Sequence, residues 1–475
     1  MGNWGEIAQR AMDIFNILII AYFFAGNGIY TILMLVSLGS ALVYNHRLAY
    51  QSLQELRNSP ATPPVTVVIP AFNEEDSILE TVRSALRSDY PGFRVIVVDD
   101  GSTDETLARL IREYQLLRMD LIDRSLLPSR RVYGSYVNPE HPQLMVITKE
   151  NGGKADALNA GINFCRSPYF CILDADCVAE PDALLRLMRP IVHSPEETLA
   201  CGGIIRVRNG CKVAGGRIER VNLPPSWIEK LQVVEYLRSF LFGRLGWDLT
   251  GGTLIVSGAM AMFPRRRVVE AGGFSPKTVS EDMELIVRLR RQAAQDKRRA
   301  QTSFILDTIC WTECPSSVAM LARQRRRWQL GLCQTLQLNF SMLFNWQYGS
   351  AGLVSFPFHL FIEGLGSAVE FIGYLVVPLA FALHLALLNF YIPLIILSLV
   401  YASFLSVGAV LVEELTYRRY PARRDFFALL GWSVLENFGF RQMIVYFRFQ
   451  GFLQFLAGLR HWEKVAHTAA EADAA

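Results

Sequence analysis

The two ends of the chain are strongly apolar, whereas its middle alternates between short apolar runs and polar stretches. Met12–Tyr44 contains Asp13 as its single charged residue, and Leu353–Val412 contains only two glutamates. A membrane-spanning helix needs about 20 apolar residues in a row. The pattern therefore predicts one span in the first segment and two in the second, near Ser367–Leu388 and Tyr391–Val412.

Smaller features refine this membrane prediction. Leu353–Leu365 is expected to be an interfacial or re-entrant piece, and Pro378 and Asn389–Pro393 are expected to mark where the chain folds back. The N-terminal segment lacks the basic start and cleavage site of a signal peptide, which predicts a retained anchor. The loop Tyr417–Arg424 carries four arginines, so the positive-inside rule assigns it to the cytoplasm. Because two spans return the chain to the side that it left, the middle region is also predicted to be cytoplasmic.

The last apolar segment, Phe426–Phe447, contains polar residues that are costly in lipid, among them Glu436, Asn437 and Arg441. Two alternatives fit this pattern equally well. Either the polar groups face a bundle interior or a water-filled path, or the segment is an amphipathic helix on the membrane surface. The alanine-rich, acidic tail after His467 is predicted to be disordered.

The middle region has the pattern of an α/β domain. After a proline-containing linker, four apolar runs read as buried strands: Val65–Ile69, Arg94–Val98, Leu144–Ile147 and Tyr169–Leu173. Helix-like stretches follow them, starting near Glu75, Asp104, Gly153 and Pro181. Strands that alternate with helices predict a parallel sheet, and such sheets bind ligands at the carboxyl ends of their strands. Acidic and amide side chains gather at those ends, namely Asn73-Glu74, Asp99-Asp100 and Asp174/Asp176.

These patterns divide the chain into five regions. They are an N-terminal membrane anchor with its linker (1–58), the α/β domain (59–312), interfacial helices (313–350), a C-terminal transmembrane region (351–465) and a tail (466–475). The net charge of +3 is too small to indicate a nucleic-acid partner. All eight cysteines lie between Cys165 and Cys333 without a CxxC pair, which indicates reduced thiols rather than a zinc site.

Two aspartate pairs carry candidate chemistry. Asp99 and Asp100 exceed what a turn with a helix cap requires, and they can accept hydrogen bonds from a uracil N–H or a ribose hydroxyl. Asp174 and Asp176 supply hard oxygen ligands at positions i and i+2, which suit Mg²⁺ or Mn²⁺ bridging a diphosphate. The segment Asn151-Gly-Gly-Lys154 is not a phosphate-binding loop, because alanine follows the lysine and the upstream glycine is missing.

Two further motifs each allow two interpretations. Glu281 and Asp282 open a predicted helix, where they either complement its dipole or provide a general base. Gln324-Arg-Arg-Arg327-Trp328 precedes the C-terminal spans. It is either an interfacial helix with an aromatic-belt tryptophan, or Arg327 neutralises a leaving diphosphate while Trp328 offers a flat face to a sugar.

The four motifs, in this order, resemble those of the membrane-embedded family 2 glycosyltransferases that build cellulose, chitin, hyaluronan and poly-N-acetylglucosamine. The resemblance covers most of the chain and implies a GT-A α/β domain with a Rossmann-like sheet plus α-helical transmembrane segments. It implies that donor binding is shared by Asp99, Asp100, Lys154, Asp156, Asp174, Gln324 and Arg327. It assigns a Mg²⁺ or Mn²⁺ ion to Asp176 and Asp174, the catalytic base to Asp282 beside Glu281, and the acceptor to Trp328, Ser257 and Gly258. Ser280-Glu-Asp stands where Thr-Glu-Asp is more usual, a mild departure that leaves the base intact.

The resemblance implies an inverting, processive enzyme that polymerises a UDP-sugar, with UDP-GlcNAc as the best guess, and passes a β-linked polysaccharide across the membrane. One alternative is a non-processive synthase that adds a single sugar to a lipid, and a more distant one is a non-catalytic transporter or scaffold. The implied partners are the UDP-sugar, a growing polysaccharide or glycolipid, the lipid bilayer and a small accessory membrane subunit. The implied location is the cell membrane, with several spans and a cytoplasmic catalytic domain.

Overall fold

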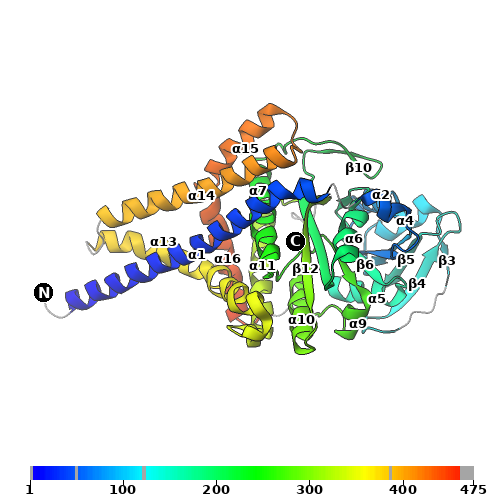
Figure 1. Cartoon of the computed structure of the whole chain (residues 1–475), viewed down its shortest axis with the longest axis horizontal. Coiled ribbons are helices and arrows are strands. Elements are labelled where there is room, and N and C mark those ends of the chain that lie inside the picture. The colour runs from blue at the N-terminus through cyan, green and yellow to red at the C-terminus, as the bar shows by residue number, and fades with distance from the viewer. Residues whose placement is uncertain (1–3, 49–51, 120–124, 384–387, 460–475) are drawn as a thin grey trace.

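The computed structural model describes residues 4–48, 52–119, 125–383 and 388–459. A sheet domain lies at one end of the molecule, and long apolar helices extend from it toward the other end (Figure 1). Between the two parts lie the helices α7 (Trp227–Arg238), α11 (Val318–Leu338) and α16 (Phe440–Leu456).

The sheet has ten strands in the order β3-β4-β5-β2-β1-β6-β11-β8-β12-β7. The four predicted runs form its parallel centre as β1 (Val65–Ala71), β2 (Phe93–Asp99), β5 (Leu144–Lys149) and β6 (Tyr169–Leu173). The remaining strands are β3 (Leu117–Arg118), β4 (Val132–Val137), β7 (Val178–Ala179), β8 (Glu197–Val207), β11 (Met260–Pro264) and β12 (Ala300–Thr312). β4 and β11 run antiparallel to their neighbours, so the prediction of a parallel sheet holds for the centre, and the whole sheet is mixed. A separate hairpin joins β9 (Lys212–Ala214) to β10 (Arg217–Arg220).

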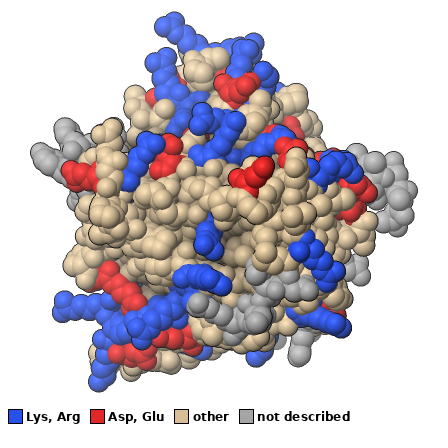
Figure 2. All heavy atoms as spheres, turned by 90° about the vertical axis from the view of Figure 1, so that its right-hand side faces the viewer, with Lys and Arg blue, Asp and Glu red and all other residues tan. Residues whose placement is uncertain are grey.

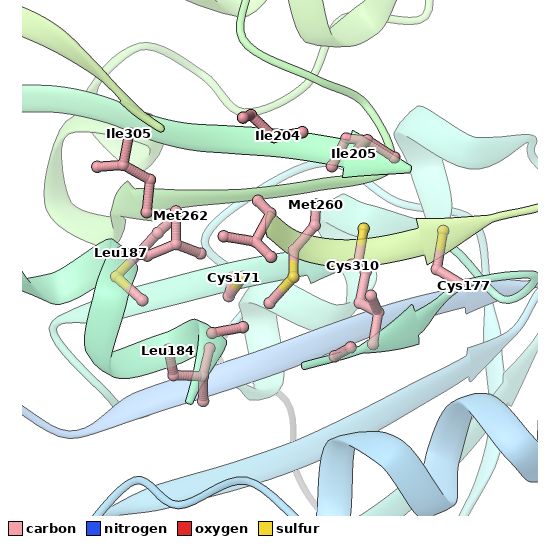
Figure 3. Packing of buried hydrophobic residues seen from close by; sticks show 14 of the residues in the cluster. Cys171, Cys177, Leu184, Leu187, Ile204, Ile205, Met260, Met262, Ile305 and Cys310 are labelled. Atoms are coloured by element: carbon pink, nitrogen blue, oxygen red, sulfur yellow. The ribbon is translucent and has the colours of Figure 1, made fainter. Parts of the chain in front are cut away.

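The core forms on both faces of the sheet because successive strand residues point to opposite sides. On one face, Val67 of β1 belongs to the cluster that includes residues of α3 (Ile78–Leu86), α4 (Thr106–Tyr114) and α6 (Ala183–His193). On the other face, Val68 belongs to the cluster with α5 (Lys154–Phe164) and α10 (Glu281–Gln295). Figure 3 shows part of the first cluster, where Cys171, Met262 and Leu187 come from three different elements. Two short helices, α2 (Leu53–Asn58) and α9 (Arg265–Glu270), complete this domain.

Three helical stretches are long and apolar enough to cross a membrane among the described residues: Met12–Ala41, Ala351–Ala382 and Tyr391–Thr416. The first lies within α1 (Trp4–Leu48) and the third within α14 (Leu388–Thr416). Their large apolar side chains are exposed, with Ile17 at 66% and Val400 at 61%. The opposite end of the molecule carries many Lys, Arg, Asp and Glu side chains (Figure 2). This contrast is typical of a chain with one end in lipid and the other in water.

The second apolar stretch differs from its prediction. Leu353–Leu365 is not a separate piece, because two π-helical segments (Ala351–Ser355 and His359–Gly364) and α12 (Phe356–Phe358) lead directly into α13 (Gly366–Ala382). Pro378 lies inside α13 and Pro393 inside α14, so neither proline breaks its helix. Proline removes one backbone hydrogen bond, and apolar membrane helices tolerate it because neighbouring groups and local adjustments satisfy the freed carbonyl. The end of the predicted span Ser367–Leu388 includes residues 384–387, which lie outside the described residues.

The last apolar segment is divided into α15 (Arg423–Leu435) and α16, separated by Gly439 with a φ of +91°. Glu436 is buried, and it accepts hydrogen bonds from Arg238 of α7 and Ser406 of α14. Asn437 donates to the Ser403 hydroxyl at 3.1 Å. These polar groups therefore face neighbouring helices, which favours the interior alternative over a surface helix. The whole of the predicted tail, 466–475, lies outside the described residues.

Gly161 tests the packing of α5 on the sheet. A Cβ atom at this position would lie 2.5 Å from Val68 Cγ1 and 3.1 Å from Val98 Cγ2. We expect Gly161→Ala to lower the free energy of unfolding by about 1 to 3 kcal/mol, because the core is overpacked. The matched control is Gly431→Ala in α15, where the added Cβ would have no atom within 4 Å beyond the local helix backbone. The control gains the same helix propensity without a clash, so thermal unfolding in detergent should give a lower Tm only for the first variant.

Candidate functional site

The predicted site residues lie at the carboxyl edge of the central strands. Asp99 is the last residue of β2, and Asp174 directly follows β6. Asn73, just past β1, has a left-handed φ of 53°, and its side-chain oxygen accepts the N–H of Thr103 at 2.8 Å. This contact joins the loops that follow β1 and β2. The strands thus bring residues that are distant in sequence to one edge.

Asp100 and Asp156 share a buried lysine that the sequence analysis did not single out. Lys149 Nζ lies 2.6 Å from a carboxylate oxygen of each aspartate, and its side chain is fully buried. Asp100 also accepts the backbone N–H groups of Gly152 at 3.0 Å and Gly153 at 2.7 Å. Burial raises the pKa of Asp100, and Lys149 and the two N–H groups offset part of that shift. The cluster fixes the loop that leads from β5 into α5.

The neighbouring residue Asp99 is also held by its own surroundings. It accepts a hydrogen bond from the Thr148 hydroxyl at 2.8 Å and one from the Ser102 backbone N–H at 3.2 Å. Asp99 and Asp100 are both buried. Their first observable role in the structure is therefore to order the loop between β2 and α4, next to the cluster of Lys149.

A second lysine gathers the remaining acidic motifs. Lys154, the first residue of α5, lies 2.6 Å from Asp174 and 3.4 Å from Glu281, and it donates to the Gly258 carbonyl at 3.2 Å. Burial lowers the pKa of Lys154, but Asp174, Glu281 and Asp282 outweigh burial and raise it. The ammonium group therefore stays charged at neutral pH. It bridges α5, the end of β6 and the start of α10.

Burial has the opposite effect on the two carboxyl groups that Lys154 contacts. Burial raises the pKa of Asp174 and of Glu281, and Lys154 offsets part of each shift. Asp282 adds to both shifts through repulsion between like charges. A site with this balance favours the arrival of further positive charge near Asp174, because a cation reduces the repulsion.

Asp282 lies in the first turn of α10, against the backbone of Gly258. A Cβ atom at Gly258 would lie 2.8 Å from Asp282 Oδ2, so glycine permits this close approach. The hydroxyl of the preceding Ser257 accepts the N–H of Ala259 at 3.3 Å, and Ser257 is buried. The structure thus brings Ser257 and Gly258 beside the predicted base.

Asp176 lies next to the end of β12. Both of its carboxylate oxygens are 3.5 Å from the Thr312 hydroxyl. Among the described residues no group of three or more His, Cys, Asp or Glu side chains could hold a metal ion. Asp174 and Asp176 nevertheless supply the oxygen ligands that Mg²⁺ and Mn²⁺ prefer, and these ions commonly take further oxygens from substrate phosphates. The residues present fit such an ion when a diphosphate completes its coordination.

The motif on α11 contacts the same region from the membrane side. Arg327 donates to the Val279 carbonyl at 3.4 Å, two residues before Glu281, and its charge lowers the pKa of that glutamate in opposition to burial. The side-chain oxygen of Gln324 is buried and has no hydrogen-bond partner among the described residues. A hydrogen-bond donor on a bound ligand would satisfy this oxygen.

Trp328 is half-exposed, and one of its ring faces is covered by the Arg325 guanidinium at 4.4 Å from the ring centroid. Arg325 itself forms a bidentate ion pair with Glu235 of α7 at 2.8 Å. The sequence analysis missed this pair, because nothing in the spacing of residues 235 and 325 indicates that α7 and α11 are neighbours. Trp328 therefore offers at most one free face to a sugar.

Comparisons with known proteins give a consistent picture. The model of the glycosyltransferase-like family 2 matches residues 63–331, more than half of the chain. The chain is 25% identical over 276 residues to a poly-beta-1,6-N-acetyl-D-glucosamine synthase of Staphylococcus aureus, which is 58% of this chain and 56% of that protein. It is 24% identical, with the same coverage, to the synthase of that name from Staphylococcus epidermidis. The chain thus matches little more than half the length of these curated relatives.

Solved structures are similar at a lower level. A mannosyltransferase of Pyrobaculum calidifontis, in complex with GDP-Man and Mn²⁺, has a TM-score of 0.45 and 20% identity, covering 88% of this chain and 99% of that one. A glucosyl-3-phosphoglycerate synthase of Mycobacterium tuberculosis, in complex with Mn²⁺, UDP and its product, has a TM-score of 0.35 and 15% identity, covering 60% and 84%.

Lys149 provides a test of the buried cluster. We expect Lys149→Met to destabilise the chain by about 3 to 5 kcal/mol, because the buried carboxylate of Asp100 and the partly buried one of Asp156 lose their shared cation. Lys212→Met is the control, since Lys212 pairs with Glu219 at the surface and is 70% exposed. The change in Tm should be large for the first variant and small for the second. Equal Tm values for the two variants would contradict this account of the cluster.

Proposed function

The chain belongs to the glycosyltransferase-like family 2, and from that premise we propose that it is an inverting, processive enzyme that polymerises sugar from a UDP-sugar donor. The observation that carries the proposal is the cluster of Lys154, Asp174, Glu281 and Asp282 beside Gly258. This cluster combines a charged lysine, a carboxylate for the donor side and a carboxylate for the acceptor side. The family membership supports reading them as parts of one transfer site.

In the proposed reaction, Asp282 takes the proton from an acceptor hydroxyl as its oxygen attacks the anomeric carbon of the donor sugar. The bond between that carbon and the diphosphate oxygen breaks, and UDP leaves with the bonding electrons. Attack from the face opposite the diphosphate inverts the configuration and gives a β-linkage. Lys154 lies close enough to Asp282 for their charges to interact, so the proposed base and the donor-side cation belong to one cluster.

The donor diphosphate carries negative charge that several residues are arranged to offset. Arg327 and Lys154 supply cations. The buried side-chain oxygen of Gln324, which has no partner among the described residues, can accept a hydrogen bond from a hydroxyl of the donor. Asp176 and Asp174 would hold a Mg²⁺ or Mn²⁺ ion, which supplies charge stabilisation for the leaving diphosphate. We assign the nucleoside to the surroundings of Asp99, Asp100 and Asp156, which the Lys149 cluster holds in place.

The three candidate spans support a multi-pass protein of the cell membrane with the sheet domain in the cytoplasm. The relatives named poly-beta-1,6-N-acetyl-D-glucosamine synthase support UDP-GlcNAc as the donor and a polysaccharide as the product. The proposed acceptor is the growing chain, bound near Trp328, Ser257 and Gly258 and passed toward the apolar helices. A small accessory membrane subunit is a further proposed partner.

Product sizing tests this proposal directly. The full chain in lipid nanodiscs receives Mg²⁺ or Mn²⁺ with labelled UDP-GlcNAc, UDP-glucose or UDP-galactose in separate reactions. We expect a high-mass product from UDP-GlcNAc. We also expect Asp282→Asn to lower its rate of formation by about 10²- to 10⁴-fold, the range for loss of a general base. The matched control is Asp296→Asn. Asp296 directly follows the C-terminal end of α10 and its side chain is 59% exposed, so this variant should remain active.

Each alternative outcome has its own meaning. A single-sugar adduct that extracts with lipid would replace the polymerase by a glycolipid synthase. Polymer from UDP-glucose or UDP-galactose alone would change the donor and leave the mechanism intact. Full activity of Asp282→Asn would show that another group is the base.

A further inference from the structure

A buried ion pair joins the sheet domain to the third candidate span. Arg206 of β8 donates from Nη1 and Nη2 to the two carboxylate oxygens of Glu413 at 2.9 and 2.7 Å. The two side chains are 1% and 4% exposed. Glu413 lies in the last turn of α14, inside the stretch Tyr391–Thr416. Two parallel hydrogen bonds fix both the distance and the orientation of the paired groups.

The same guanidinium also holds β12 in place. Arg206 Nε donates to the Thr308 hydroxyl at 2.6 Å, and its charge lies 5.9 Å from the centroid of the Trp311 ring. Trp311 is the register partner of Arg206 across the β8–β12 ladder. The indole N–H of Trp311 donates in turn to Glu180 at 2.8 Å, just beyond β7. One side chain therefore connects α14 with the end of β12 and with the segment around β7.

Asp176 lies at the far side of this connection. The Thr312 hydroxyl, next to Trp311 in β12, is 3.5 Å from both oxygens of Asp176. Trp311 also pairs with Val178 of β7, two residues after Asp176. Both contacts depend on where the end of β12 lies, and β12 has register irregularities on either side of Thr308 that leave this end less constrained by ladder geometry alone.

We propose that Arg206 and Glu413 are a positioning pair that holds Asp176 in the orientation needed for the divalent ion and the diphosphate. This inference rests on the proposed function, since it assumes that Asp176 holds the ion. Without the Glu413 carboxylate, the Arg206 guanidinium is a buried charge that must find another partner, and Thr308 and Trp311 move with it. A metal ligand whose supporting contacts are lost binds its ion more weakly.

The test is Mn²⁺ binding by the full chain in nanodiscs with UDP present, followed by electron paramagnetic resonance of free Mn²⁺. We expect Glu413→Gln to weaken Mn²⁺ binding by about 10-fold or more, the effect seen when support of a metal ligand is lost. The matched control is Glu436→Gln, because Glu436 is also 4% exposed and also pairs with an arginine, Arg238 of α7. Among the described residues Glu436 bonds to Arg238 and Ser406 and to no residue of β7 or β12, so its loss should leave Mn²⁺ affinity unchanged.

If the wild-type chain binds Mn²⁺, two results would overturn the positioning role. One is that Glu413→Gln binds Mn²⁺ as tightly as the wild-type chain does. The other is that Glu413→Gln and Glu436→Gln lose the same amount of affinity, which would indicate a general loosening of the structure. If Glu413→Gln does not fold, the double variant Arg206→Met/Glu413→Leu leaves no unpaired charge and should still bind Mn²⁺ weakly. Absence of Mn²⁺ binding in the wild-type chain with UDP would instead contradict the metal site of the proposed function, and the positioning role with it.

Discussion

Repulsion among carboxylates at the carboxyl edge of the sheet is the constraint that organises this molecule. Two lysines offset it, each between a pair of acidic residues: Lys149 between Asp100 and Asp156, and Lys154 between Asp174 and Glu281. Each lysine is costly to bury alone, as is each carboxylate, so neither cluster is stable without both kinds of charge. The β5–α5 connection carries both lysines, five residues apart, and is therefore the segment on which the edge depends.

The two lysines differ in what they leave available for a ligand. Lys149 is fully buried, and its contacts serve the backbone of the loop that follows β5. Lys154 is 31% exposed, and its partner Asp174 is 27% exposed, so solvent and small molecules reach this second pair. A divalent ion at Asp174 and Asp176 would compete with Lys154 for the same carboxylate. A diphosphate arriving with that ion would give the displaced ammonium of Lys154 a new partner. Lys154 would then exchange its ion pair with Asp174 for one with the diphosphate when the donor binds.

The sequence predicts the parts of this structure that depend on local pattern. Apolar runs bounded by turns locate β1, β2, β5 and β6 to within a few residues, and the acidic motifs fall at their carboxyl ends as the topology requires. The antiparallel strands β4 and β11 were not predicted, since the direction of a strand depends on distant neighbours. The membrane turn was predicted between Leu388 and Tyr391, whereas α13 ends at Ala382 and α14 already begins at Leu388.

Partners distant in sequence set the limit of prediction in the site. Lys149 reads as an ordinary strand-end lysine until the fold brings it to Asp100, and Arg206 has no sequence feature that connects it with Glu413. The same holds for the polar residues near Glu436, whose two interpretations differ only in which helices surround them. In each case the stability of the buried charge depends on a partner that is buried with it. The two residues are too far apart in sequence for a local pattern to reveal the pair.

The position of the site at the junction with the apolar helices follows from these long-range pairs. Gly258 and Asp282 face Lys154 on the sheet side, whereas Arg327 approaches Glu281 from α11, which packs against α16. Ion pairs then fix the helices around this junction: Arg325 with Glu235, Arg238 with Glu436, and Arg448 with Glu363. Salt bridges between rigid elements define relative position more sharply than apolar contacts do, because hydrogen-bond geometry is directional. Under the proposed function, an acceptor bound beside Asp282 would therefore be held at a fixed place relative to the apolar helices.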